Sequence, residues 1–505
     1  MTQTADRPPP ALPGVKATIL SPADARVLVG VAAAAVVSDL ALRSGAVGLA
    51  GALLVAVAAA TLLASGRLHT RSAWLAVTAA PLFGAWLAFR TSPWLVPLDV
   101  LAAAGLLALG ASLARGGSLA DLTIPRVALR AIHAGVHAVA APAFVAAPIR
   151  AAREQVSDDR HTNLTVRVAR GLLLAAPVLI LLGVLLASAD AVFASFFRFD
   201  LHPITLAEHV VALAAGAWGA AALLRVTSVT PPGRPAGRRP PIGAVEATVV
   251  LAGMCVLFAA FTAAQLVALS EGGRHVLATA GLTYAEYARS GFFQLLAVAV
   301  ITLGVLLLLR ATTDLAGPGQ RATFTAVAEV AVTLTVVIVV VAVRRLNLYE
   351  DAFGLTMLRF YSELFSYWIG VVFLFLGTAL ADVGHGRGWF VGAAAAAGLA
   401  LLLALNVANP EAVVARDQLP GARQAQRPDV VYVARLSRDA IPTVAARLPG
   451  LDPVARADLR AQLCPVEPDS VPPPRFTGWA AWNLGRRRAE RALTHVCGVA
   501  RPQMR

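Results

Sequence analysis

The sequence is poor in charged residues. Charged side chains make up 14% of the 505 residues, and hydrophobic residues 58%. A soluble protein of ordinary composition carries roughly 25% charged residues. Lys16 is the only lysine, so arginine supplies nearly all of the net charge of +14. Because the arginines flank apolar runs, the charge indicates a membrane protein and argues against a nucleic-acid partner.

The sequence also lacks the motifs of the common soluble enzymes. It contains no GxxxxGK[ST], GxGxxG, GxSxG, HExxH or CxxC pattern, so no cofactor is expected and no catalytic residue is assigned. His133 and His137 have the spacing of a helical metal pair, but no third ligand lies nearby in the sequence. We therefore interpret them as part of a polar helix face and predict no metal site.

Long apolar runs are what the sequence has in abundance. A bilayer core about 30 Å thick requires about 20 apolar residues in a helix. The pattern predicts an all-α, polytopic membrane protein of about eleven transmembrane helices, with a small α-helical extramembrane domain at the C-terminus. The predicted spans are 27–42, 45–65, 72–89, 94–114, 170–189, 204–224, 243–268, 291–309, 322–343, 363–382 and 388–407.

The loop charges predict the orientation. With the N-terminus inside, the inner segments before the last span carry twenty basic residues and the outer loops eight, which is the bias that the positive-inside rule requires. The first residues are polar and proline-rich, so the first span is expected to be a retained anchor. The composition suits a GC-rich bacterium, whose plasma (inner) membrane would hold the chain. An odd number of spans then places the C-terminal domain outside.

This topology divides the chain into seven parts. They are a disordered cytoplasmic N-terminus (1–26), helices 1–4 (27–114), a cytoplasmic loop (115–169), helices 5–6 (170–225), a Pro/Arg-rich linker (226–242), helices 7–11 (243–407) and the C-terminal domain (408–505).

Two inner segments are candidates for contact with anionic lipid, 115–170 and 226–242. In the first, Arg126, Arg130, His133 and His137 share one face of a predicted helix over 126–138. That helix either lies on the inner leaflet or packs between spans. For the linker, a plain tether is the favoured alternative.

The C-terminal domain shows ordinary helix signals. Asp452 followed by Pro453 predicts a cap and first turn for a helix that runs to Leu463. Cys464 and Cys497 each lie near the end of a predicted helix, and in an oxidising compartment they would form a disulfide. The alternative is two unpaired thiols. Cys255, within a span, is expected to be a packing residue.

Ionisable residues within apolar runs are candidate functional residues, because an unpaired charge is costly in a bilayer. Asp39, Asp99 and Glu329 are the intramembrane candidates. Glu329 is the deepest, whereas Asp39 lies at a span boundary, where a structural role is expected.

Two segments expected outside, 283–295 and 344–365, combine charged and aromatic residues. They would form a polar, aromatic-rimmed pocket under the C-terminal domain. The alternative is an interfacial aromatic belt with internal salt bridges. The candidate residues are Tyr284, Glu286, Tyr287, Arg289, Asn347, Tyr349, Glu350, Asp351 and Arg359.

Four strings carry a resemblance to a known family: LLASADAVF, TYAEYARSGFFQL, RLNLYEDAFGLTMLRFY and ANPEAVVAR with the following DVVYVARLSRDAIPTVAARL. They resemble bacterial multi-pass membrane proteins, an actinobacterial and firmicute group catalogued as domain of unknown function 4173 and related to group 4153. The resemblance covers roughly residues 27 to 490. It implies this membrane plan, but no activity, substrate or cofactor.

Three functions remain open. The first is an envelope scaffold or sensor that binds a protein partner through 408–505. The second is an ion-coupled transporter that uses intramembrane carboxylates. The third is a membrane enzyme acting on a lipid-linked substrate at the outer face. We rank them in this order and favour a non-enzyme.

Overall fold

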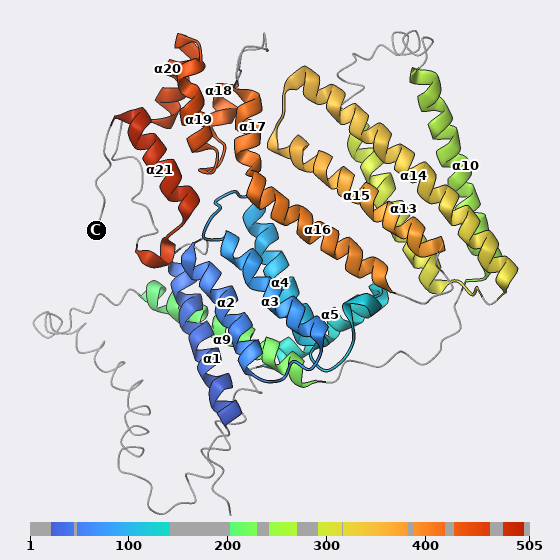
Figure 1. The fold of residues 1–505 in the computed structure, drawn as a ribbon, viewed down its shortest axis with the longest axis horizontal. Coiled ribbons are helices and arrows are strands. Elements are labelled where there is room, and N and C mark those ends of the chain that lie inside the picture. Colours follow the sequence, from blue (N-terminus) through green and yellow to red (C-terminus); the bar gives the residue numbers. More distant parts are fainter. Residues whose placement is uncertain are drawn as a thin grey trace, which may run out of the picture.

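The computed structural model describes residues 22–44, 48–141, 203–229, 242–269, 291–315, 317–381, 388–419, 429–464 and 478–498. Within these ranges the regular structure is helical, apart from one isolated bridge between Ile242 and Thr313. The all-α membrane class is therefore confirmed. Figure 1 shows two groups of long helices, with a set of short helices at one end.

Five long helices form the first bundle. Its core includes Leu62, Val77 and Leu224, all buried. Close approach of backbones is typical of membrane helices, which use small residues at their contacts. A Cβ at Gly216 would lie 2.4 Å from the Cβ of Ser38, so only glycine fits there. The helices are α1 (Pro22–Arg43), α2 (Leu49–Ala64), α3 (Arg71–Trp86), α4 (Leu95–Leu113) and α9 (Pro203–Ser228).

The second bundle packs around Phe324 and Phe373, whose side chains are fully buried. Its helices are α10 (Ala244–Leu269), α13 (Phe292–Thr312), α14 (Pro318–Phe353) and α15 (Met357–Ala381). Helix α16 (Trp389–Ala408) contacts both α4 and α15, and so joins the two bundles (Figure 1).

Seven helices in the described part of the chain are long and apolar enough to cross a membrane. Only 17% of the apolar stretch of α10 is buried within the protein, so its apolar surface faces outward, as a lipid-facing helix requires. At 16 residues each, α2 and α3 are shorter than the span of about 20 residues that a bilayer core requires. The predicted run 170–189 lies outside the described residues. The count of about eleven spans therefore stays a prediction.

Helix α5 (Ile124–Val139) has its polar face toward the protein. Arg130 donates to the carbonyl oxygen of Gly116 at 3.1 Å, and the Nε2 atoms of His133 and His137 lie 3.1 Å apart. Ile132, by contrast, is 65% exposed. An outward apolar face suits a helix at the bilayer surface, although lipid contact through 115–170 and 226–242 stays a prediction.

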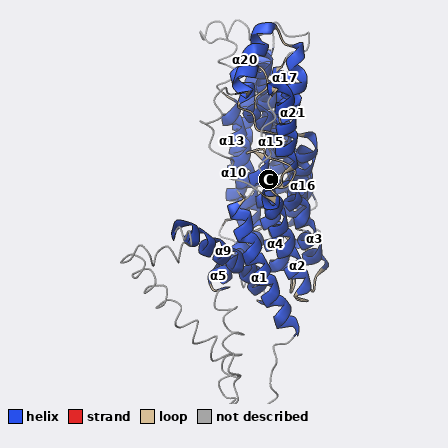
Figure 2. Cartoon of the chain, turned by 90° about the vertical axis from the view of Figure 1, so that its left-hand side faces the viewer, coloured by secondary structure: helices blue, strands red, loops and turns tan. Residues whose placement is uncertain are grey.

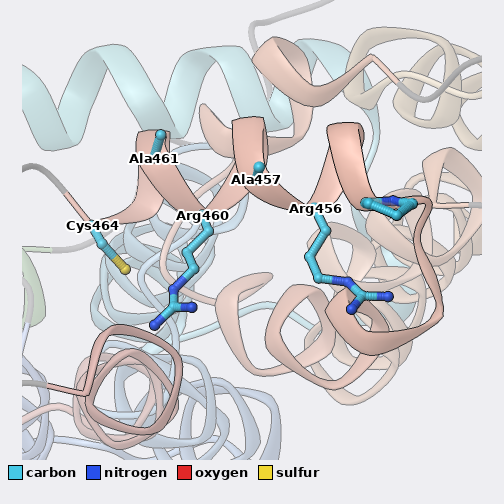
Figure 3. A pocket seen from close by; sticks show the side chains of 6 residues that line it. Arg456, Ala457, Arg460, Ala461 and Cys464 are labelled. Atoms are coloured by element: carbon cyan, nitrogen blue, oxygen red, sulfur yellow. The ribbon is translucent and has the colours of Figure 1, made fainter.

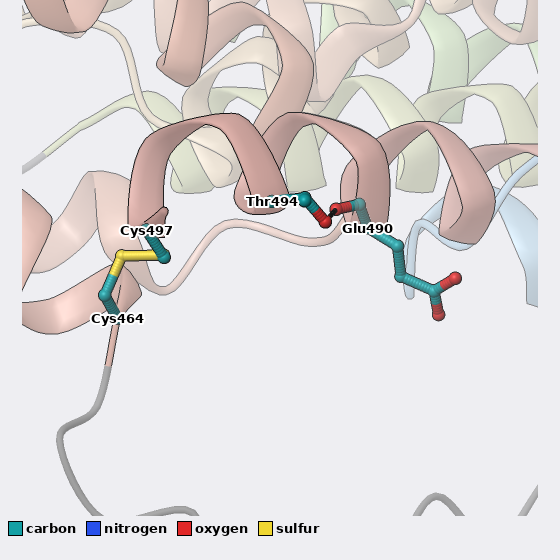
Figure 4. The surroundings of a disulfide bond; sticks show 4 residues. All are labelled: Cys464, Glu490, Thr494 and Cys497. Carbon is teal, nitrogen blue, oxygen red and sulfur yellow. Dashed lines mark hydrogen bonds between the residues drawn. A yellow bond between two sulfur atoms is a disulfide. The ribbon is translucent and has the colours of Figure 1, made fainter. Parts of the chain in front are cut away.

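The C-terminal domain is built from short helices around Leu419, Val433, Val444 and Leu459. In the side view of Figure 2 it lies at one end of the long helices. A disulfide between Cys464 and Cys497 joins the ends of its last two helices (Figure 4). The helices are α17 (Pro410–Gln418), α18 (Val430–Ala434), α19 (Ile441–Arg447), α20 (Pro453–Leu463) and α21 (Leu484–Cys497).

Candidate functional site: a polar junction beneath the C-terminal domain

The loop between α3 and α4 fastens the C-terminal domain to the membrane helices. Oδ2 of Asp439, a residue only 4% exposed, accepts hydrogen bonds from the backbone N–H groups of Thr91 at 2.7 Å and Ser92 at 2.9 Å. Close packing accompanies these bonds, because a Cβ at Gly485 would lie 2.3 Å from Oδ1 of Asp439.

Asn483 makes a second attachment to the same loop. Its side-chain amide donates to the carbonyl oxygens of Leu87 and Arg90, both at 2.9 Å. Its Oδ1 accepts from the backbone N–H of Arg486 at 3.0 Å and so caps α21. One side chain therefore both begins the last helix and docks it.

Glu411, at the start of α17, is 1% exposed. Its Oε1 accepts from the hydroxyl of Ser92 at 2.9 Å, and its Oε2 accepts from the backbone N–H of Ser437 at 3.1 Å. Burial raises the pKa of this carboxyl, and the nearby charge of Asp439 raises it further. The carboxylate thus ties together the α3–α4 loop, α17 and the segment before α19.

The contacts continue into the membrane region. Nε of Arg90 donates to the carbonyl oxygen of Asn406 at 2.8 Å, and the Asn406 side-chain amide donates to Oδ1 of Asp99 at 2.7 Å. Asp99 and Asn406 are both fully buried, on α4 and α16. We define the polar junction by the six residues that link the domain to these two helices: Arg90, Ser92, Asn406, Glu411, Asp439 and Asn483.

Asp99 and Asn406 are also chemically complementary. Oδ2 of Asp99 and Oδ1 of Asn406 are buried and have no hydrogen-bond partner among the described residues. A proton on Oδ2 would let Asp99 donate to the amide oxygen of Asn406 and close a two-bond acid–amide pair. A neutral Asp99 therefore fits its surroundings better than a buried, half-satisfied carboxylate.

A pocket of about 360 Å³ opens beside the junction. It is lined by residues 93–94, 356–358, 411, 432 and 435–437, so four separate segments build it. Three hydrogen bonds hold the α14–α15 turn to the domain. Leu355 N–H donates to Asp417 at 3.0 Å, and the Gln418 side-chain amide donates to the Leu355 carbonyl oxygen at 2.7 Å. Met357 N–H donates to the Tyr432 hydroxyl oxygen at 2.7 Å. The segment 344–365 therefore does touch the C-terminal domain.

None of the described residues predicted for this face lines the pocket. Arg359 lies over the Tyr349 ring, 4.1 Å from its centroid, and Asn347 and Asp351 are exposed. Neither these residues nor Glu350 lines the pocket. Tyr284, Glu286, Tyr287 and Arg289 lie outside the described residues. The predicted site residues thus remain a hypothesis. The pocket takes residues 356–358 from the same segment, between Asp351 and Arg359.

The other predicted carboxylates lie apart from the junction. Asp39 pairs with Arg43 at 3.0 Å and with Nδ1 of His209 at 2.7 Å, which links α1 to α9. Glu329 lies on α14 close to Gly377 of α15, and its Oε1 is buried without a partner among the described residues. In the same part of the chain, no cluster of three or more His, Cys, Asp or Glu side chains has the arrangement of a metal site.

A second hollow of about 470 Å³ lies on α20, lined by Arg456, Arg460 and Cys464 among others (Figure 3). Arg456 donates to the carbonyl oxygens of Pro449 at 2.7 Å and Leu451 at 2.8 Å, so it closes the preceding turn. This hollow lies away from the polar junction, and the Arg456 side chain in it is already hydrogen-bonded to backbone carbonyl oxygens.

The buried Glu411 predicts a pH dependence of docking. The ordinary pKa of glutamate is 4.5, and burial raises it here, so the folded junction favours the neutral acid. Docking of the C-terminal domain is therefore expected to be strongest below pH 4.5 and to weaken as the pH rises through the raised pKa. Because one proton is released, the equilibrium constant for docking falls by at most about tenfold per pH unit. Hydrogen exchange of residues 429–464 measures this opening. A Glu411→Gln variant should show a flatter profile, and an unchanged profile would refute the assignment.

Comparison with known proteins identifies a family. Residues 77–446 match the family model described as Domain of unknown function (DUF4153). The match is to group 4153 and not to group 4173, which corrects the name drawn from the resemblance. No curated protein and no solved structure matches the chain. The matched range includes five of the six junction residues and covers well over half of the sequence, so the chain belongs to the DUF4153 family.

Proposed function

We propose that this protein is an envelope scaffold or sensor of the bacterial plasma membrane, in which the C-terminal domain lies outside and reports to the membrane helices. The observation that carries the proposal is the continuous polar junction, from Asp439 and Glu411 through the α3–α4 loop to Asn406 and Asp99. A tethered domain would need no such network. Buried polar networks are satisfied in one arrangement, so a change at one end alters the energy of the other.

A double-mutant cycle tests this coupling. Asp439→Ala, Asn406→Ala and the double variant would be compared in full-length protein in nanodiscs, by hydrogen exchange of residues 429–464. If the junction couples the C-terminal domain to the membrane helices, the effects of the two substitutions on the free energy of opening should be non-additive by about 0.5–3 kcal/mol. Thr335→Ala serves as the matched control, because Thr335 is buried and hydrogen-bonded within α14, in the second bundle. Additive effects of the Asp439 and Asn406 substitutions would mean that the two residues are not coupled, and would reject the proposed sensor.

The orientation is tested by the cysteines of the C-terminal domain. A disulfide between Cys464 and Cys497 suits an oxidising compartment. In intact cells carrying Cys255→Ala, a membrane-impermeant maleimide is expected to label the domain only after treatment with an impermeant reductant. Labelling that requires permeabilised cells would place the domain inside and contradict the proposed topology.

An ion-coupled transporter is the second candidate, favoured by the partnerless Oε1 of Glu329 at the α14–α15 contact. Purified protein in liposomes that enclose a pH-sensitive dye separates the two functions. A transporter would move protons in a manner abolished by Glu329→Gln and unaffected by Glu208→Gln, an exposed acid on α9. A scaffold or sensor would show no flux that depends on Glu329. For an enzyme at the outer face, the ion pairs of Asp39 instead favour a structural role.

A further inference from the structure

The pocket beside the junction holds an unused hydrogen-bond donor. The Tyr432 hydroxyl oxygen accepts from Met357 N–H at 2.7 Å, and the hydroxyl hydrogen makes no hydrogen bond within the described part of the chain. It can therefore still donate one hydrogen bond to a ligand in the pocket. The Ser437 hydroxyl, by contrast, is already used: its oxygen accepts from Asp439 N–H at 3.3 Å, and its hydrogen bonds to the Glu411 carboxylate.

Arg435 adds a positive charge to the same wall. Its side chain is exposed, and within the described part of the chain its guanidinium makes no ion pair or hydrogen bond. A planar guanidinium beside a hydroxyl donor is an arrangement that can bind phosphate or carboxylate oxygens.

The one acidic residue of the lining does not oppose an anion. Both oxygens of Glu411 already accept hydrogen bonds, from Ser92 and Ser437. Burial also raises the pKa of this carboxyl, which favours its neutral form. The polar side of the pocket is therefore complementary to a group that carries negative charge and offers acceptors.

The other side of the pocket is apolar and continuous with the membrane helices. Trp94 is 39% exposed and stacks on Tyr361 with ring centroids 5.1 Å apart, while Leu358 is 53% exposed. Trp94 immediately precedes α4 and Leu358 lies in the first turn of α15, so both lie at the ends of membrane-spanning helices. Aromatic residues at such ends face the boundary between acyl chains and headgroups.

We infer that this pocket binds the phosphate headgroup of an amphiphile, with Arg435 and Tyr432 contacting the phosphate oxygens and Trp94 and Leu358 contacting the apolar portion. The inference deepens the proposed function, because it names the chemical class of ligand that the junction would sense. The phosphate can come from a bilayer lipid or from a soluble phosphate ester.

The test uses full-length protein in neutral detergent, with three probes: phosphatidylglycerol, phosphate-free diacylglycerol and glycerol 3-phosphate. Binding is measured by native mass spectrometry and by hydrogen-exchange protection of residues 354–358 and 430–437. We expect phosphatidylglycerol to bind and protect, and diacylglycerol to do neither. Arg435→Gln should weaken binding roughly tenfold, the loss of one charge-assisted contact. Tyr432→Phe should weaken it less.

Arg438→Gln is the matched control. Arg438 is exposed on the same segment, lies 3.9 Å from Glu490 and does not line the pocket. If glycerol 3-phosphate also protects residues 354–358 and 430–437 from hydrogen exchange, and Arg435→Gln removes this protection, a soluble phosphate ester is a sufficient ligand. That result would support the phosphate site. Binding that is equal for diacylglycerol, or equally reduced by Arg435→Gln and Arg438→Gln, would overturn the inference.

The same variants separate this inference from the proposed function. Arg435 makes no junction contact, so Arg435→Gln should leave the coupling between Asp439 and Asn406 intact. If the protein binds no phosphate but the coupling between Asp439 and Asn406 is intact, only the proposed ligand is rejected. If phosphate binding depends on Arg435 but that coupling is missing, only the proposed sensor function is rejected.

Discussion

Replacing Asp439 by alanine is expected to release the C-terminal domain from the membrane helices. The backbone N–H groups of the half-buried Thr91 and the fully buried Ser92 would lose the carboxylate that accepts their hydrogen bonds. Each orphaned donor costs about 1–3 kcal/mol, so docking should weaken by about 3 kcal/mol in total. Hydrogen exchange of residues 429–464 should then accelerate by about a hundredfold.

Two further variants sharpen that result. Asp439→Asn keeps an oxygen where Oδ2 now accepts both hydrogen bonds, so its effect should be smaller than that of alanine. Asp458→Ala removes an exposed acid on α20 and should change nothing. If Asp439→Ala behaved like Asp458→Ala, the junction would not be what holds the domain.

Removing the disulfide should have an effect of similar size within the domain itself. Cys464 and Cys497 are 33 residues apart in the sequence. A cross-link that closes a loop of this length restricts the unfolded chain and contributes about 4 kcal/mol in the chain-entropy account. The double variant Cys464→Ser/Cys497→Ser should therefore lower the free energy of opening of α20 and α21 by about that amount.

Hydrogen exchange of residues 453–463 and 484–497 measures this effect, and Cys255→Ala, a change in α10 far from the domain in sequence, is the control. Equal protection in the double variant and the control would mean that helix packing alone holds the domain together. A loss confined to the double variant would support the disulfide as its main internal constraint.

Local sequence signals predicted those helices whose ends or lengths depend on neighbouring residues. Asp452 caps α20, which begins at Pro453 and ends at Leu463, as the cap pair predicted. The predicted run 388–407 corresponds to α16, Trp389–Ala408. A cap depends on one side chain and the next turn, and a span depends on consecutive apolar residues, so both are readable without the fold.

The polar junction was much harder to predict from the sequence. Asp99 is a candidate from the sequence because it is an ionisable residue within an apolar run, but its partner Asn406 is more than 300 positions away. The one available clue was Asn406 itself, an amide inside the run LLLALNVA. Asp439, Glu411 and Asn483 look like ordinary helix-end residues, and in part they are, since Asn483 does cap α21.

The membrane class and most of the helices could be predicted from the sequence, because hydrophobicity and capping act over a few neighbouring residues. Which polar groups meet became known from the fold, which brings Arg90, Asn406, Glu411 and Asp439 together and forms a pocket beside them. A buried hydrogen bond requires a partner, but local sequence does not specify where in the chain that partner lies.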